Sequence, residues 1–351
     1  YSGGATCPSL LLEPSRTNLI KQSEYYEGSD WSSQQTLETL ENVTNPEGTN
    51  TTYKVCANAS NSNHYLERAP YTGATSGVDY VFSFFAKAED SDFVQVATST
   101  GFAAKYQNFN LSNGTFGNGD ANAFGYTSTI EAVGTNGWYR ISVKATTTST
   151  NARFLIVPIL SDISARNPIF LGDGSSGFYM WGAQLEQASY PTSYIPTHGS
   201  SVTRSQENHQ LNITSIITSS SFTWFFDLGD WVGSATNGGT YEIINTGSTR
   251  IQLRVRSDGY RVYYQNTNGG SAYPVAGSKT ANKFCLAYDG LNYRLFIDGS
   301  LVSTYPSVGD TNWSFLMNTG GNGVYETLII KQEVLFPTAL TDSECIKLTT
   351  I

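Results

Sequence analysis

Short runs of apolar and aromatic residues, separated by polar turns, repeat along most of the chain and predict β-strands. The clearest run covers residues 80–87, whose aromatic and β-branched side chains suit a half-buried pleated surface. Residues 93–96 alternate with period two, and the Asn113-Gly114 pair after residues 106–111 predicts a hairpin turn. Further strands are expected at residues 10–12, 52–56, 130–133, 138–144, 153–159 and 178–186. This spacing, with almost no helical periodicity, predicts an antiparallel β-sandwich.

A change in composition after Ile195 divides the chain. Pro191 and Pro196 interrupt regular structure because proline fixes φ and lacks an N–H donor. Beyond them Thr, Gly, Ser and Asn prevail, which is typical of a linker. With 351 residues there is enough chain for two domains with separate cores. We place the first domain at residues 1–205, including an N-terminal arm and a C-terminal linker, and the second at residues 206–351.

The second domain repeats the strand pattern and ends in a helix. Strands are expected at residues 222–228, 241–244, 251–255 and 260–264, and Asp289-Gly290 and Asp298-Gly299 predict two successive hairpins. Thr341 and Glu344 have the spacing of a capping box, so a short C-terminal helix should start there. Cys345 then falls at a position that packs against Leu340, which favours a structural role over a reactive one.

Charge and composition exclude two classes of partner. Twenty Lys and Arg residues stand against 29 Asp and Glu residues, and no basic run occurs, which argues against nucleic acid. No apolar run approaches the roughly 20 residues that span a bilayer, so membrane insertion is not expected, and no signal peptide is visible. Only 14% of residues are charged. The Tyr-, Asn-, Ser-, Thr- and Gly-rich surface suits a sugar-binding protein, although many extracellular all-β proteins share it.

Four ordered motifs resemble a segment of phage structural proteins, especially tail-fibre and head-fibre proteins. They are PSLLLEPSRTNL at residues 8–19, FNLSNGT at 109–115, GWYR at 137–140, and FYMWGAQLE at 178–186 followed by YPTSYIPTHGSSVTR at 190–204. The resemblance covers residues 1–205 and implies a carbohydrate-binding-like jelly-roll domain. It also implies the C-terminal part of a longer protein. Within the first motif, Arg16 and Asn18 are polar residues in an apolar setting and should hold the arm through hydrogen bonds.

The paired turns YDG and YRLFIDG, at residues 288–290 and 293–299, resemble the hairpins of concanavalin A-like and laminin G-like lectin domains. This likeness covers about residues 210–340. Together the pattern and the two resemblances predict an all-β chain of two antiparallel β-sandwich (jelly-roll) domains in tandem with a short C-terminal helix.

No arrangement of catalytic residues is evident. The run GDGSSG at residues 172–177 fits a phosphate-binding loop, but a strand follows it where that loop needs a helix, so we interpret it as a turn. His64, His198 and His209 lie in polar stretches and are expected to be solvated. Asp227, Asp230 and Glu242 could meet on adjacent strands, but the Glu-x-Asp-x-x-Glu run of related glucanases is absent. We therefore assign no catalytic residue and no enzymatic activity.

Cysteine and acidic residues leave two alternatives open. Cys7 with Cys56, and Cys285 with Cys345, are either disulfides or buried free thiols, and no spacing suggests zinc. Structural Ca²⁺, the one cofactor considered, would use the loop residues Asp120, Asp173 and Asp310. The alternative is that these three residues only form turns, which is the commoner role.

Aromatic residues in polar stretches are the best ligand candidates, because sugar rings stack on exposed aromatic faces while neighbouring polar groups bond the hydroxyls. The candidates are Trp31, Tyr65 and Tyr71 in the first domain and Trp231, Tyr264, Tyr273 and Trp313 in the second. The alternative for each one is core or interface packing.

The leading hypothesis is a fibre or decoration protein at the extracellular virion surface of a phage, which binds host cell-surface glycan for adhesion. Its expected partners are host polysaccharide and other virion proteins, and the resemblance to fibres implies a homotrimer. Two alternatives remain: a polysaccharide depolymerase or lyase, and a structural spacer or trimerisation module without a ligand.

Overall fold

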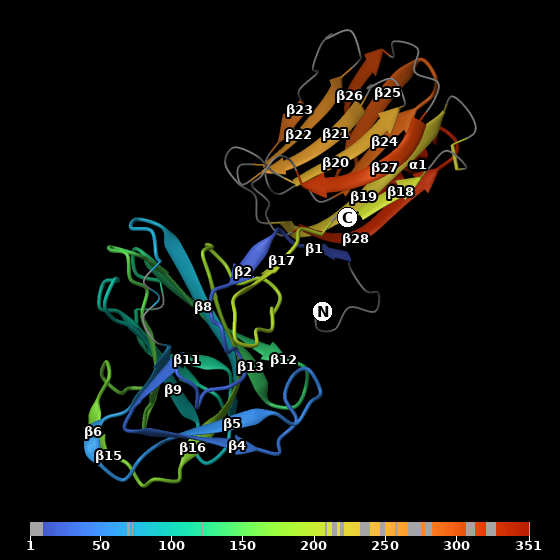
Figure 1. Ribbon diagram of the computed structural model, residues 1–351. Coiled ribbons are helices and arrows are strands. Elements are labelled where there is room, and N and C mark those ends of the chain that lie inside the picture. Colours follow the sequence, from blue (N-terminus) through green and yellow to red (C-terminus); the bar gives the residue numbers. More distant parts are fainter. Residues whose placement is uncertain are drawn as a thin grey trace. The chain divides into compact units, whose positions relative to one another are not determined.

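The chain is almost entirely β-structure and divides into two compact units (Figure 1). The computed structural model describes residues 10–68, 71, 73–120, 122–207, 209–212, 216–217, 221–231, 239–245, 250–256, 259–265, 275–277, 283–306, 313–320 and 328–350. One unit consists of Arg16–Arg204 and is here called the inserted unit. The other combines Tyr1–Ser15 with Ser205–Ile351 and is called the flanking unit.

The inserted unit contains two six-stranded antiparallel sheets (Figure 1). Sheet I has the order β11 (Thr115–Gly119), β10 (Tyr106–Asn110), β9 (Phe93–Thr98), β14 (Phe154–Pro158), β7 (Tyr65–Arg68), β3 (Trp31–Gln34). Sheet II has the order β12 (Tyr126–Val133), β13 (Trp138–Thr146), β8 (Asp79–Ala88), β16 (Gly177–Glu186), β5 (Thr52–Ala57), β4 (Thr36–Glu41). Two small pairs complete the unit: β15 (Ile169–Leu171) with β6 (Asn61–Asn63), and β17 (Val202–Arg204) with β2 (Arg16–Asn18).

One apolar core lies between sheets I and II. Successive side chains of a strand point to opposite faces, so every second residue of β8 and β14 enters the core. Phe82 of sheet II and Phe154 of sheet I stack there with ring centroids 5.4 Å apart. Val94 and Val96 of β9 are fully buried in the same cluster. The predicted antiparallel β-sandwich is therefore confirmed for residues 16–204.

Asn18 joins the start of this unit to its end. Its side chain is fully buried, and its Nδ2 donates to the carbonyl oxygens of Ala183 at 3.2 Å and Ile195 at 2.9 Å. Its Oδ1 accepts from the backbone N–H groups of Ile20 and Leu185, each at 3.1 Å. All four hydrogen-bonding positions of the carboxamide are thus used. The expectation that Asn18 holds the arm is confirmed.

Residues of two sequence motifs meet at the turn that follows β16. Glu186, fully buried, accepts hydrogen bonds from the backbone N–H and hydroxyl group of Thr192. Gln184 accepts from the backbone N–H of Ile195 at 2.7 Å, and Arg140 of β13 donates to the Thr192 carbonyl oxygen. These motif residues therefore have structural roles, because they satisfy the backbone of an irregular buried segment.

The flanking unit is a second sandwich of two six-stranded antiparallel sheets. Sheet III has the order β1 (Leu10–Leu12), β28 (Leu328–Phe336), β19 (Phe222–Trp231), β24 (Lys283–Tyr288), β25 (Asn292–Ile297), β26 (Ser300–Pro306). Sheet IV has the order β18 (His209–Asn212), β27 (Trp313–Gly320), β20 (Gly239–Asn245), β21 (Arg250–Arg256), β22 (Gly259–Gln265), β23 (Val275–Gly277). The predicted hairpins at Asp289-Gly290 and Asp298-Gly299 connect β24 to β25 and β25 to β26.

The N-terminal arm contributes to the flanking unit. Leu10 pairs with Ile330 and Leu12 with Leu328, so β1 is an edge strand of sheet III. The sequence analysis had assigned the arm to the first domain. The unit of residues 16–204 is therefore inserted between two parts of the same sandwich.

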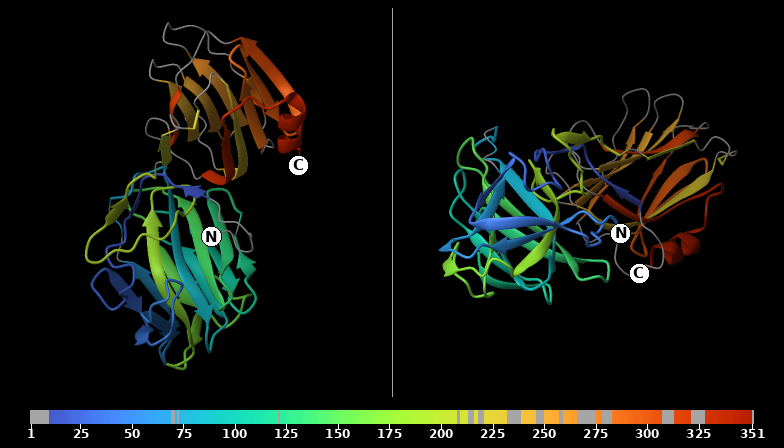
Figure 2. Two further views of the ribbon diagram at one scale, coloured as in Figure 1. Left: turned by 90° about the vertical axis from the view of Figure 1, so that its right-hand side faces the viewer. Right: turned by 60° about the horizontal axis from the view of Figure 1, so that its bottom comes forward.

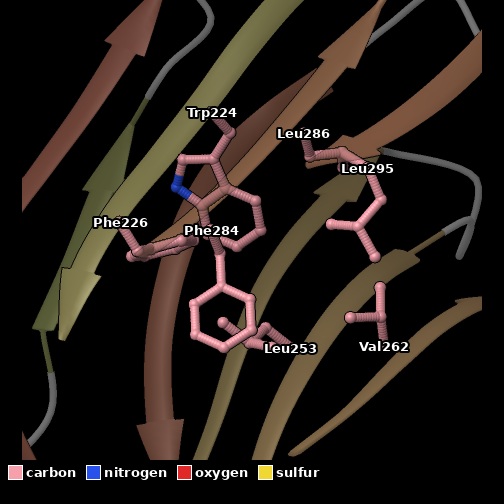
Figure 3. Close-up of a pocket in the computed structure, with 7 residues that line it drawn as sticks. All are labelled: Trp224, Phe226, Leu253, Val262, Phe284, Leu286 and Leu295. Carbon is pink, nitrogen blue, oxygen red and sulfur yellow. The ribbon is translucent and has the colours of Figure 1, made fainter. Parts of the chain in front are cut away.

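The core of the flanking unit contains a small cavity of about 20 Å³ (Figure 3). Its walls are entirely apolar and come from both sheets. They are formed by Trp224, Phe226, Leu253, Val262, Phe284, Leu286 and Leu295. A cavity of this size without polar groups suits neither a sugar nor a hydrogen-bonded water, so it is a packing defect of the core.

Helix α1 (Asp342–Thr349) ends the described chain and lies on one side of the flanking unit (Figure 2). Thr341 caps it: its hydroxyl oxygen accepts from the Glu344 backbone N–H, and the Glu344 carboxylate accepts from the Thr341 backbone N–H at 2.8 Å. The predicted capping box is confirmed, as is the burial of Cys345 against Leu340. Among the described residues, no helix has the length and apolar character to cross a membrane.

Replacing Asn18 tests whether its carboxamide holds the inserted unit together. Asn18→Asp keeps the side-chain volume but turns a carboxylate oxygen toward the carbonyl groups of Ala183 and Ile195. Because two buried acceptors then lose their donor, we expect the inserted unit to lose about 3 kcal/mol of unfolding free energy at neutral pH. Urea unfolding would measure it. Thr17→Val, which removes only an exposed bond to Thr203, is the control and should change stability by less than about 1 kcal/mol.

Glu333 of β28 is an acidic group held mostly inside the flanking unit. It lies opposite Phe226 in the sheet, and its Oε1 accepts from the indole nitrogen of Trp224 at 3.1 Å. Burial raises the pKa of the Glu333 carboxyl group from 4.5 to about 7, against a smaller lowering by the Trp224 hydrogen bond.

The raised pKa of Glu333 predicts how stability depends on pH. Between about pH 4.5 and 7 the carboxyl group ionises in the unfolded chain but stays protonated in the folded unit, so rising pH favours unfolding. We expect this group alone to cost about 3 kcal/mol by pH 8. Glu333→Gln, which keeps an acceptor for Trp224, should remove this loss, whereas the exposed Glu131→Gln should not. Equal pH profiles of wild type and Glu333→Gln in thermal unfolding would contradict the prediction.

Candidate functional site

The outer face of sheet I carries a second set of side chains that point away from the core. On β7, Leu66 enters the core while Tyr65 and Glu67 lie on the outer face. The strand register then places Glu67 beside Leu155 of β14, and Leu155 beside Ala97 of β9. Tyr106 of β10 is opposite Ala97. One row across the sheet therefore runs Glu67, Leu155, Ala97, Tyr106, with Tyr65 in the neighbouring row.

Glu67 and Arg153 form an ion pair on this face. Arg153 precedes β14, and both its Nε and its Nη2 donate to the Glu67 carboxylate. The Glu67 side chain is 5% exposed and that of Arg153 26%. The paired carboxylate raises the pKa of the Arg153 guanidinium, and the Tyr65 hydroxyl group contributes to this shift through a hydrogen bond. Because Arg153 holds both carboxylate oxygens, Glu67 is a positioning group and not a free acid.

Tyr106 lies at the far end of the same row. Its side chain is half-buried and packs against Ala97 and Leu155, and no hydrogen bond of its hydroxyl group is found among the described residues. Beside it, Asp120 accepts from the Tyr106 backbone N–H at 3.2 Å and from Lys105 Nζ at 3.2 Å. The two tyrosines thus border a strip of small and aliphatic side chains.

A loop after β14 crosses this face and carries a cation. Gln95 Nε2 donates to the Ala165 carbonyl oxygen at 2.9 Å, and the Asn167 backbone N–H donates to Gln95 Oε1 at 2.7 Å. Asn108 fixes the same loop through the carbonyl oxygens of Asp162 and Ser164.

Arg166 of this loop reaches the end of β9, where its Nη2 donates to the Thr98 carbonyl oxygen. Thr98 adjoins Ala97 in the chain, and its backbone N–H bonds the Lys105 carbonyl oxygen next to Tyr106. Within the described part of the chain, no carboxylate forms an ion pair with Arg166, and its buried Nε has no hydrogen-bond acceptor. The face therefore presents one uncompensated positive charge.

This arrangement provides groups that can bind a polar ligand. Two half-buried phenol rings offer stacking surfaces and hydroxyl groups, and Arg166 offers the guanidinium N–H groups that Thr98 does not occupy. We call Tyr65, Tyr106, Arg153 and Arg166, with Glu67, the tyrosine face. The acids considered for cleavage do not meet here: Asp227 lies in the flanking unit, 3.8 Å from Lys283 Nζ. The side chains of Asp230 and Glu242 lie outside the described residues.

Of the aromatic candidates in the inserted unit, Tyr65 belongs to the tyrosine face, and the other two lie elsewhere. Trp31 takes the alternative considered for it, which is core packing: it begins β3, is 6% exposed, and donates its indole N–H to the Gln22 carbonyl oxygen at 2.8 Å. Tyr65 is also on a strand and not in a loop. Tyr71 is half-buried, and the Arg68 guanidinium carbon lies 5.3 Å from its ring centre.

The candidates in the flanking unit are only partly described. Trp231 lies on β19, Tyr264 on β22 and Trp313 on β27, in strands and not in loops, and their side chains lie outside the described residues. Tyr273 and Asp310 lie outside the described residues altogether. The ligand roles of these residues stay predictions.

The two described Asp candidates form local contacts. Asp173 accepts from the backbone N–H groups of Ser175 and Ser176 at 2.8 and 2.7 Å, and these bonds, with one from the Ser176 hydroxyl group, lower the pKa of its carboxyl group. Asp120 holds Lys105, as described above. In the part of the chain described, no three His, Cys, Asp or Glu side chains group together as a metal site. Calcium binding stays a prediction.

His64 is not solvated, which corrects the sequence-based expectation. It is fully buried, with Nδ1 2.6 Å from the Gln35 carbonyl oxygen and Nε2 3.0 Å from that of Phe170. His198 is exposed, and the side chain of His209 lies outside the described residues. His64 therefore ties β7 to the segment before β16, because its ring bridges two backbone carbonyl groups.

Sequence reasoning missed Tyr106, Arg153 and Arg166. Tyr106 was placed in a strand without a role, although the period-two pattern of residues 93–96 offered a signal. In that pattern, every position that does not enter the core belongs to an outer face. No sequence pattern indicates that Arg166 lies on this face, because its position depends on a loop that the distant residues Gln95 and Asn108 hold.

Comparisons with known proteins place the chain in no family. No family model and no curated protein matches it. Similar solved structures include the binding domain of botulinum neurotoxin DC in complex with SialylT, with 19% identity, 43% of this chain and 39% of that chain covered, and a TM-score of 0.29. The NanB sialidase of Streptococcus pneumoniae gives 14% identity, 41% and 26% coverage, and a TM-score of 0.30. Mouse laminin α1 domains LG4-5 are 10% identical, with 81% of this chain and 90% of that chain covered and a TM-score of 0.25.

The chain spans about two fifths of the length of the neurotoxin structures that it matches. Likenesses this distant carry no argument about function, so the interpretation of this chain depends on its own residues.

A double-mutant cycle tests the ion pair of the tyrosine face. Arg153→Ala leaves the buried Glu67 carboxylate uncompensated, and we expect a loss of about 3 kcal/mol of unfolding free energy. Glu67→Ala with Arg153→Ala should cost clearly less than the sum of the single changes, because no unpaired charge remains. The more exposed Lys144–Asp79 pair, 3.2 Å apart, is the control, and Lys144→Ala should cost no more than about 1 kcal/mol. Additive costs at Glu67 and Arg153 would contradict the pairing.

Proposed function

We propose that this chain is a non-enzymatic adhesion module of a phage fibre or decoration protein, exposed on the virion, which binds host cell-surface polysaccharide through the tyrosine face. The observation that carries the proposal is a sheet face with two half-buried tyrosines, Tyr106 on β10 and Tyr65 on β7, together with Arg166 near Tyr106, for which the described residues provide no carboxylate partner. The resemblance of four sequence motifs to those of phage fibre proteins supports the virion assignment.

The chemistry of the face favours a carboxylated saccharide. Sugar rings present C–H groups to phenol rings, and their hydroxyl groups match the tyrosine hydroxyls. Arg166 would bond a sugar carboxylate through the guanidinium N–H groups that Thr98 does not occupy, and such charge-assisted bonds are stronger than neutral ones. Neighbouring cations do not add to this charge, since Arg153 pairs with Glu67 and Lys105 with Asp120.

Size exclusion with light scattering tests the proposal directly. The full chain would be run alone and after incubation with host polysaccharide, in one neutral and one uronic acid-containing form. Movement of the protein peak with intact polysaccharide supports adhesion, and the run without ligand measures the oligomer, which we expect to be a trimer. Polysaccharide of reduced mass would overturn the proposal in favour of a depolymerase. Unchanged peaks with every host polysaccharide would favour the spacer alternative.

Variants of the tyrosine face should separate its contributions. Tyr65→Ala or Tyr106→Ala should weaken polysaccharide binding at least about tenfold, since a loss of 1.4 kcal/mol corresponds to that factor. Arg166→Gln should weaken binding of the carboxylated form but leave that of the neutral form unchanged. Phe124→Ala is the control, because Phe124 is fully exposed and lies outside the face. Equal binding by all four variants in calorimetry would place the ligand elsewhere.

A further inference from the structure

Helix α1 is fixed to the outer face of sheet III by a cluster that contains two cysteines. Cys285 lies in the middle of β24, between Phe225 of β19 and Phe296 of β25 in the strand register. Cys345 is the buried residue of the first turns of α1. Both thiols are fully buried, and both belong to one apolar cluster that also includes Phe225, Phe296 and Ala287.

Both cysteines are free thiols in the structure, and they share one small buried cluster. The Cys285 thiol lowers the pKa of the Cys345 thiol, and the Arg294 guanidinium adds a smaller lowering. The Cys345 thiol and burial together raise the pKa of the Cys285 thiol. Of the two, the Cys345 thiol is therefore the one favoured as the thiolate.

The surrounding contacts hold the thiols in this position. At the start of the helix, Arg294 of β25 pairs with Asp342 and donates to the Leu340 carbonyl oxygen at 3.0 Å. At its end, the Gly299 backbone N–H donates to the Thr349 hydroxyl group at 3.1 Å. Because both ends of α1 are bonded to the β25–β26 hairpin, Cys345 is held against the face of sheet III that carries Cys285.

We propose that Cys285 and Cys345 are an oxidation site, at which a peroxide converts the thiol pair into a disulfide that covalently fastens α1 to sheet III. The proposal is independent of glycan binding, since it concerns the flanking unit alone. Of the remaining cysteines, Cys56 belongs to the inserted unit, with its thiol near the Leu37 carbonyl oxygen, and Cys7 lies outside the described residues.

The chemistry requires one equivalent of hydrogen peroxide. The Cys345 thiolate attacks one peroxide oxygen, the O–O bond breaks, and the protonated leaving hydroxide forms water, which leaves a sulfenic acid on Cys345. The Cys285 sulfur then attacks the Cys345 sulfur and displaces a second water. Two thiols and one peroxide thus become one disulfide and two waters. Local opening of α1 gives peroxide access, since a short element with few buried side chains opens at a lower free-energy cost than the whole unit.

The disulfide changes what the helix can do. In the reduced protein, α1 can detach from the face formed by Phe225 and Phe296 while the sandwich stays folded. In the oxidised protein, residues 286–344 form a closed loop, and detachment requires reduction of the bond. Cross-linking of this kind restricts the unfolded chain and raises stability.

Intact-mass spectrometry with peptide mapping tests the proposal on the full chain. After treatment with hydrogen peroxide and quenching, we expect loss of two hydrogens and a non-reduced peptide that joins Cys285 to Cys345. The midpoint of thermal unfolding should rise by several degrees and return after dithiothreitol. Cys345→Ser and Cys285→Ser should each abolish the cross-link and the rise. Cys56→Ser is the matched control, a buried thiol in the other unit, and should leave both unchanged.

Hydrogen exchange provides a readout that needs no variant. The amides of α1 should exchange at least about tenfold more slowly in oxidised than in reduced wild type, while those of β8 stay unchanged. Two findings would overturn the proposal: both thiols remaining free to alkylation in denaturant after peroxide treatment, or a cross-link that joins Cys285 or Cys345 to a different cysteine. Equal exchange of α1 in the two forms would refute the fastening of the helix.

Discussion

The inserted unit depends on the carboxamide of Asn18, which forms four hydrogen bonds in a place that water does not reach. A buried backbone group without a partner is costly, and residues 187–197 after β16 belong to no strand. The side chains of Asn18, Gln184 and Glu186 supply hydrogen-bond partners for this segment. The strand β16 can therefore continue into a buried irregular segment whose backbone groups are hydrogen-bonded.

The tyrosine face follows from this closed sandwich. Once the core selects Leu66, Val96 and Phe154, alternation sends Tyr65, Ala97 and Leu155 to the other side of sheet I. The loop that carries Arg166 is then attached by Gln95 and Asn108, which are polar residues buried on that same side. The position of Arg166 thus depends on the hydrogen bonds that Gln95 and Asn108 form with its loop.

Periodicity in the sequence predicted the strands that contribute most to the two cores, because aromatic and β-branched residues recur where both sheet faces are covered. It missed β3 and β7, which are short, largely polar and defined by pairing with each other. His64 was misjudged for the same reason, since its polar neighbours along the chain do not show which segments pack over it. The capping box of α1 was predictable because its contacts are local. The tyrosine face joins residues from 65 to 166, so only tertiary structure brings it together.

The pairing of β1 with β28 bears on the order in which the protein is synthesised. Residues 10–12 leave the ribosome before the whole inserted unit, and their partners at residues 328–330 leave it after. A domain that folds during synthesis can form residues 16–204 at once, because all its strands are then present. Sheet III cannot be completed at that stage, because its edge strand β1 has been synthesised but the neighbouring strand β28 has not. Vectorial synthesis therefore imposes a sequence of events on this chain: the insertion folds first, and its completion brings the two ends of the other sandwich together.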